Sequence, residues 1–212
     1  MSIVKLNNRG VKNATAFGSG VTSLGSMTFI KKLTASSSST LSFVDGSSSV
    51  VLDNTYKEYL FTFKDIHNGD SSQVDFQFNL SADSGSNYNV TKTTTNFYAF
   101  NSEPGYGNEA IAYGSSDDLA QGTGFQNITS FPLGNANDDC LAGYLHLFNP
   151  SSTTFVKHFV ARSHQSEGDS NYYTNDTFMG GYANTTSAID AVQFKMSSGN
   201  IDAGDICLYG IN

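Results

Sequence analysis

The sequence contains no tryptophan, only three prolines and two cysteines, and charged residues make up only 14% of its 212 positions. Both cysteines, Cys140 and Cys207, lie in apolar runs, so we expect two buried free thiols, with a disulfide as the alternative. No run reaches the ~18 apolar residues of a membrane span, and no apolar segment follows Met1 as it would in a signal peptide. We therefore expect a soluble chain that is made in a cytosol and does not span a membrane.

The residues that are abundant favour β-structure. Phenylalanine (16) and tyrosine (11) are frequent, and 20 glycines stand among many serine, threonine and asparagine residues. This mixture is typical of strands joined by tight turns, and it argues against a disordered chain. No window has the sustained apolar stripe and end signals of a helix. The spacing of the strand-like runs predicts an all-β domain, an antiparallel β-sandwich with jelly-roll wiring.

Residues 141–164 are the expected centre of this sandwich. They form two apolar runs separated by Asn149-Pro150-Ser151-Ser152, which is turn chemistry. In both runs, the odd- and the even-numbered positions, which face opposite sides of a strand, are largely apolar. We therefore expect a central antiparallel pair that is covered on both sides. The cleanest single strand is 74–80, where alternation with polar residues predicts one buried face made of Val74, Phe76, Phe78 and Leu80.

Charge is distributed unevenly along the chain. Five basic residues precede the first acidic residue, Asp45, so a formal net charge of −8 leaves −13 on residues 45–212. Residues 1–26 follow neither a strand nor a helix period, so we expect an extended arm (1–26) before a β-sandwich body (27–212). Lys5, Arg9 and Lys12 could anchor this arm on an acidic partner, although a chance grouping of lysines is the alternative. The acidic body would be repelled by phosphates, so we expect no nucleic-acid binding.

The residues that could carry chemistry form no catalytic constellation, so we expect neither enzymatic activity nor a cofactor. His146 and His158 could face each other across the central pair and ligate a metal. A structural role is favoured, because no carboxylate or cysteine follows at a ligand spacing. The turn at 135–139, which includes Asp138 and Asp139, is the best candidate for a weak calcium site, but a plain polar turn is favoured there. We therefore expect no metal.

Surface recognition is the remaining possibility. Tyrosines stand beside asparagine in two polar, glycine- and serine-rich loops, and the candidates are Tyr106, Asn171, Tyr172 and Tyr173. Tyrosine offers a large contact area at low entropic cost, and asparagine adds adaptable hydrogen bonds, which is the composition of binding loops. Contact with a glycan or receptor, packing between subunits, and ordinary exposed loops all remain open.

Six blocks of the sequence carry a resemblance: KLNNRGV (5–11), TASSSSTLSF (34–43), YKEYLFTFKDIH (56–67), GYLHLFNPSSTTFVKHF (143–159), NTTSAIDAVQFKMSSGNI (184–201) and ICLYGI (206–211). With these blocks nearly the whole chain resembles a family of tailed-bacteriophage virion proteins common among marine phages, including cyanophages. The resemblance implies a particle component with a β-sandwich body, and it brings no catalytic residues.

We therefore expect a non-enzymatic virion structural protein, made in the host cytoplasm and located in the virion. Its partners would be other virion proteins of the tail or capsid, two further copies in a homotrimer (by analogy with other phage surface proteins), and a host surface glycan. A short tail fibre with a role in host attachment is narrowly favoured over a capsid decoration or cement protein. The alternative from another class is a calcium-dependent glycan-binding or hydrolytic β-sandwich.

Overall fold

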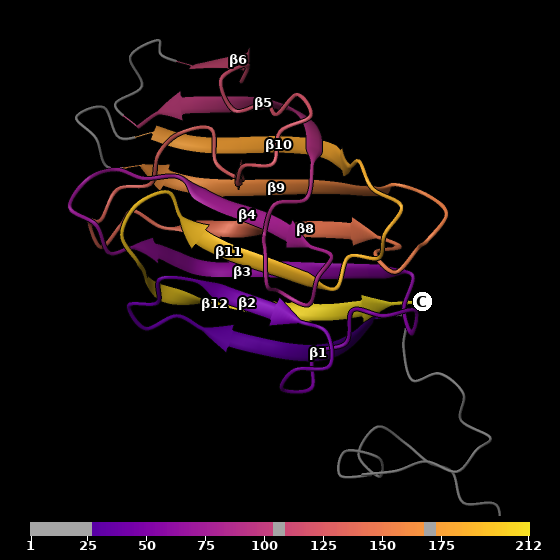
Figure 1. Ribbon diagram of the computed structural model, residues 1–212. Coiled ribbons are helices and arrows are strands. Elements are labelled where there is room, and N and C mark those ends of the chain that lie inside the picture. Colours follow the sequence, from indigo (N-terminus) through magenta and orange to yellow (C-terminus); the bar gives the residue numbers. More distant parts are fainter. Residues whose placement is uncertain (1–26, 104–108, 168–172) are drawn as a thin grey trace, which may run out of the picture.

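The computed structural model describes residues 27–103, 109–167 and 173–212, which form an all-β sandwich of two antiparallel sheets (Figure 1). The predicted fold class is confirmed. The arm predicted for residues 1–26, with Lys5, Arg9 and Lys12, lies outside the described residues and stays a prediction. The described residues contain no helix that is long and apolar enough to cross a membrane.

Twelve strands make up the described part of the chain. In order, they are β1 (Met27–Thr34), β2 (Leu41–Val44), β3 (Glu58–Asn68), β4 (Phe76–Ser81), β5 (Lys92–Ser102), β6 (Glu109–Tyr113), β7 (Gln126–Asn127), β8 (Leu141–Phe148), β9 (Lys157–Glu167), β10 (Tyr173–Ala183), β11 (Ala191–Met196) and β12 (Ile201–Ile211). The larger sheet has eight strands in the order β1-β12-β3-β8-β9-β10-β5-β6, and the smaller has four in the order β2-β11-β4-β7.

Eight of these strands follow jelly-roll wiring. Through β1, β2, β3 and β4 the chain changes sheet at every step, and it does so again through β7, β8, β11 and β12. The other four strands enter as two pairs, β5-β6 and β9-β10, and all four join the larger sheet beyond β8. The insertions therefore double the width of one sheet and leave the other at four strands.

Aromatic side chains fill the space where the two sheets overlap. The four residues of the face predicted at 74–80 are all buried, and β3 adds Tyr59, Phe61 and Phe63. At the centre, the ring of Phe194 on β11 lies 5.3 Å from that of Phe63 and 5.9 Å from that of Phe76. Aromatic pairs at such separations contribute beyond simple burial, so this cluster is the main apolar core.

The inner face of the added strands is mixed, because Phe159 and Met179 are buried there beside several polar residues. Buried residues along it hydrogen-bond to the connection between β6 and β8: Ser163 Oγ donates to the carbonyl of Ile128 (2.8 Å) and Gln165 Nε2 to that of Phe131 (2.9 Å). Thr94 Oγ1 donates to Gln126 Oε1 at 2.7 Å. Buried polar groups need such partners. The added half of the sheet is thus covered in large part by this hydrogen-bonded connection, which includes the short strand β7.

The predicted central pair is β8 and β9, which occupy the fourth and fifth places of the eight-stranded sheet. Leu141, Leu145 and Leu147 point inward and are fully buried. Their neighbours Tyr144 and Val160 point outward and are exposed, so the predicted cover on both sides is wrong for the described residues. The reason is that the four-stranded sheet packs on one face only, which leaves an apolar outer face without a second layer.

Candidate functional site

The outer face of the eight-stranded sheet, turned away from the four-stranded sheet, is the candidate functional surface. Apart from Phe155, the large apolar side chains that are well exposed in the described residues share this face: Met27, Phe29, Phe97, Ile111, Tyr113, Tyr144 and Val160. Exposed apolar side chains gathered on one face of a sheet mark a candidate interaction surface.

Arg162 on β9 organises the middle of this face. Its Nε and Nη2 atoms donate to Asp176 on β10 at 2.9 and 2.6 Å, and its guanidinium lies 4.7 Å from the ring centroid of Phe178. These hydrogen bonds and the charge of Asp176 raise the pKa of Arg162 above its ordinary value. Phe178 in turn stacks on Phe97 of β5, with centroids 5.0 Å apart and planes at 4°. The bidentate pair and the stack hold these side chains in one arrangement.

Two shallow hollows lie on either side of this cluster and meet at His164. One, of about 310 Å³, lies over β8 and β9 beside Tyr144, and the other, of about 280 Å³, lies over β9, β10 and β5 beside Asn101. His164 Nε2 is 2.8 Å from Thr174 Oγ1. Exposed aromatic rings beside fixed polar groups can recognise another protein or a polar ligand.

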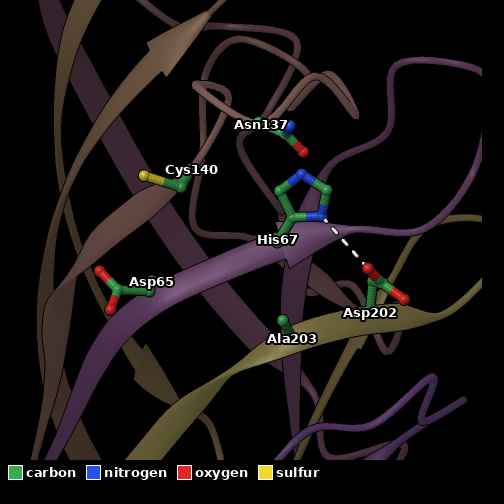
Figure 2. Close-up of a pocket in the computed structure, with 6 residues that line it drawn as sticks. All are labelled: Asp65, His67, Asn137, Cys140, Asp202 and Ala203. Atoms are coloured by element: carbon green, nitrogen blue, oxygen red, sulfur yellow. Dashed lines mark ion pairs between the residues drawn. The ribbon is translucent and has the colours of Figure 1, made fainter.

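A separate pocket of about 410 Å³ lies where β3 ends, near the starts of β8 and β12 (Figure 2). It brings together Cys140, His67 and Asp202, the residue types of a thiol-based hydrolase. His67 Nδ1 lies 3.6 Å from Asp202 Oδ2, while Nε2 lies 3.0 Å from the carbonyl oxygen of Ala136. Both ring nitrogens therefore face oxygen atoms, and Figure 2 shows the Cys140 sulfur pointing away from the ring. This arrangement does not place the imidazole against the sulfur.

The two histidines of the central pair do not form a joint site. His146 lies opposite Val160, and its Nε2 is 2.9 Å from Glu58 Oε2 on β3. His158 packs near Tyr182 on β10, with ring centroids 6.1 Å apart. Their rings thus contact strands on opposite sides of the pair, which fits the structural role favoured for both. Both cysteines are free and half-buried.

The candidate calcium turn is closed by its own hydrogen bonds. Asp139 is almost fully buried, and its Oδ2 accepts a hydrogen bond from the backbone amide of Ala136 at 3.1 Å. Asp138 is exposed. Within the described ranges, no three side chains of histidine, cysteine, aspartate or glutamate come together as a metal site. The geometry resembles the polar turn favoured from the sequence.

The predicted recognition residues are only partly visible. Tyr106, Asn171 and Tyr172 lie outside the described residues. Tyr173 begins β10 and is half-buried, with its ring 5.6 Å from that of Phe100 and 6.0 Å from that of Phe131. It pairs with Ser102, the last residue of β5. The end of β5 and the start of β10 therefore lie side by side at one end of the sheet.

Two buried lysines were not foreseen from the sequence. Lys92 is fully buried in the Thr-rich β5, and its Nζ donates to Asn79 Oδ1 at 2.6 Å and to the carbonyl of Val90 at 2.8 Å. Burial lowers the pKa of Lys92 to about 8. Burial also lowers the pKa of Lys157, whose Nζ donates to the carbonyl of Thr185 at 3.0 Å. Nothing in the local sequence separates these lysines from exposed ones.

Comparisons with family models, with curated proteins and with solved structures found no match to this chain. A β-sandwich supports many unrelated functions, so the fold does not identify one. The outer face of the sheet and the sequence blocks quoted above are therefore the features that bear on function.

Proposed function

We propose that this chain is a non-enzymatic structural protein of a tailed-bacteriophage particle, displayed on the surface as a β-sandwich. Residues 1–26, with Lys5, Arg9 and Lys12, would anchor it to other virion proteins, and the body would associate as a homotrimer. The exposed apolar outer face of the eight-stranded sheet carries this proposal, because it suits a protein that works by packing against others. The resemblance of the six sequence blocks supports the choice of a phage virion.

Host attachment, as in a short tail fibre, is favoured over capsid decoration by the end of the sheet near Tyr173. Ser102 and Tyr173 pair there, and in the sequence a tyrosine- and asparagine-bearing segment follows the first and another precedes the second. The rings of Phe100, Phe131 and Tyr173 pack together at this end of the sheet and form a rigid cluster. Binding loops held by a rigid scaffold are the usual arrangement for recognition, and a host surface glycan is the proposed ligand.

Electron microscopy of intact particles, labelled with an antibody against the chain, tests this proposal. Label on the tail is the expected result, and label spread over the capsid would favour the cement role instead. Particles that contain none of the protein by mass spectrometry would refute a virion function. A matched test of attachment compares host-cell binding by the full chain and its Tyr172→Ala variant, with Phe155→Ala as the exposed control.

A calcium-dependent glycan-binding sandwich is the second candidate, and one feature favours it. The buried Oδ1 atom of Asp139 has no hydrogen-bond partner in the structure, and carboxylate oxygens are calcium ligands. Metal analysis of the purified full chain, with Asp139→Asn as the comparison, separates the two functions. Stoichiometric calcium that the variant loses would favour the second.

A further inference from the structure

The eight-stranded sheet ends in two edge strands, β1 and β6. Among the described residues β1 pairs only with β12, and β6 pairs only with β5. Figure 1 shows the two strands at opposite edges of the sheet. Seven strand spacings of about 4.8 Å put them roughly 34 Å apart, so the two edges of one copy cannot contact each other. Each edge presents backbone groups that another strand could pair with.

Both edges carry exposed apolar side chains on the outer face. On β1, Met27 is 53% and Phe29 is 56% exposed, and on β6 Ile111 is 78% and Tyr113 61% exposed. Phe29 packs edge-on against Tyr209, with centroids 5.6 Å apart, so it is held in position before any partner arrives. Proteins usually shorten, charge or cover the edges of a sheet. β1 has two lysines and a bulge and β6 is only five residues long, so both edges are partly protected in this way. The apolar side chains that remain exposed on both edges point to a contact there.

The charges of the two edges are opposite. β1 contains Lys31 and Lys32 and no acidic residue, and Lys32 is paired with Asp205 on β12 at 3.1 Å, so Lys31 supplies the charge of this edge. β6 contains Glu109 and no basic residue. Tyr113 on β6 also donates a hydrogen bond to Asp118, which adds a carboxylate beside that edge. A contact of β1 with β1, or of β6 with β6, would bring like charges together. A contact of β1 with β6 pairs opposite charges and places apolar side chains against apolar side chains.

We propose that copies of this chain associate head to tail, with the β1 edge of one copy against the β6 edge of the next. A contact between two different surfaces cannot close as a two-fold dimer, so it produces a ring of three or more copies or an open filament. The trimer is the smallest such ring. The inference rests on the self-association in the proposed function, but it needs neither the particle nor residues outside the described ranges.

The first test measures the size of the full chain by sedimentation velocity over a range of concentrations. The wild-type chain should form a ring of at least three copies or a longer filament, and a chain that stays monomeric or stops at a dimer would overturn the inference. Phe29→Ser damages one edge and Ile111→Ser the other, so each variant alone should be monomeric. Phe155→Ser is the matched control, because Phe155 is 69% exposed but belongs to neither edge, and it should keep the wild-type size.

Mixing the two edge variants distinguishes head-to-tail contact from symmetric contact. The Ile111→Ser variant keeps its β1 edge and the Phe29→Ser variant keeps its β6 edge. An equimolar mixture should therefore form one intact contact and stop at a dimer, because the two remaining edges are damaged. A mixture that stays monomeric, or a single variant that dimerises by itself, would contradict the proposal.

A charge exchange gives an independent test that leaves the apolar residues in place. Lys31→Glu and Glu109→Lys should each weaken assembly several-fold at low salt, since each puts like charges across the contact. The chain with both substitutions should recover assembly, because every contact again joins opposite charges. A double variant that assembles no better than the single ones would overturn the proposed pairing. Circular dichroism and urea unfolding show whether each variant is folded. If an apolar variant does not fold, the charge variants at Lys31 and Glu109 alone decide whether the proposed contact is correct.

The two proposals fail on different measurements. A monomeric chain in solution defeats the head-to-tail contact, whatever the particle contains. Absence from the particle defeats the virion function, whatever the size of the free protein. A ring in solution from a protein that no particle contains would uphold the contact alone.

Discussion

Lys92 makes the stability of the protein depend on pH in a direction that can be measured. An unfolded chain binds this proton with the ordinary pKa of 10.5, whereas burial lowers the folded pKa to about 8. Between these values the unfolded state holds more protons, so the free energy of unfolding rises with pH. Below about pH 8 both states are protonated and the full cost of the buried charge remains. Burial lowers the pKa of Lys157 as well, which acts in the same direction.

The magnitude follows from the two pKa values. Raising the pH from about 7.5 to about 10 should add about 2 kcal/mol from Lys92 alone. Tyr59 sets the upper limit, because burial raises its pKa. Above about pH 10 the unfolded chain loses that tyrosine proton and the folded chain keeps it, so stability falls again. We therefore expect a maximum near pH 10 instead of the more usual range of about pH 5 to 8.

Urea unfolding at a fixed protein concentration, in reducing buffer, measures this effect. For a slope of about 2 kcal/mol per molar, the midpoint should move up by about 1 M across the interval. Lys92→Met keeps most of the apolar stem and removes the ammonium, so it should lose most of the rise. Lys64→Met is the matched control, because that side chain is 72% exposed, and it should keep the rise. A wild-type curve that is flat or falling between about pH 8 and 10 would refute the reasoning.

Two further predictions concern packing and backbone. Phe76→Ala should destabilise the protein by ~3–5 kcal/mol, because the buried ring packs on Phe63 and Phe194, whereas Phe155→Ala at the surface should change the free energy of unfolding by less than ~0.5 kcal/mol. Equal urea midpoints for the two variants would contradict the assigned core. Gly204→Ala should cost at least ~1–3 kcal/mol, because Gly204 has φ +116° and a Cβ there would lie 2.5 Å from the carbonyl oxygen of Asp65. Gly124→Ala, in open space, should be near neutral by the same assay.

Alternation of residue types was sufficient to predict much of the fold. Val74, Phe76, Phe78 and Leu80 face the core as expected, and the turn at Asn149 joins β8 to β9 with the positive φ of 47° that asparagine tolerates. These features are local, so the sequence of each segment contains the information. The jelly-roll wiring followed from the spacing of such segments.

Long-range features could not be predicted in the same way. Ser163, Gln165, Asn175 and Thr177 line part of the inner face of β9 and β10. Polar residues at alternate positions look the same in a sequence whether they meet solvent or a hydrogen-bonded connection. The candidate surface was missed for a related reason. Met27, Phe29, Ile111 and Tyr113 are far apart in sequence, and only the strand order places them on one face at two edges.

The inserted strands account for the proposed contact. Without β9, β10, β5 and β6, the larger sheet would have four strands, as the smaller one does, and β8 would be its edge. With the insertions, β8 is paired with a strand on each side, and β6 becomes the edge of the sheet. The glutamate and the exposed Ile111 of β6 complement the lysines and the phenylalanine of β1. They also carry Arg162, Phe178 and Phe97, which fix the middle of the outer face. The same departure from an even sandwich thus supplies one half of the head-to-tail contact and the widened surface between its two ends.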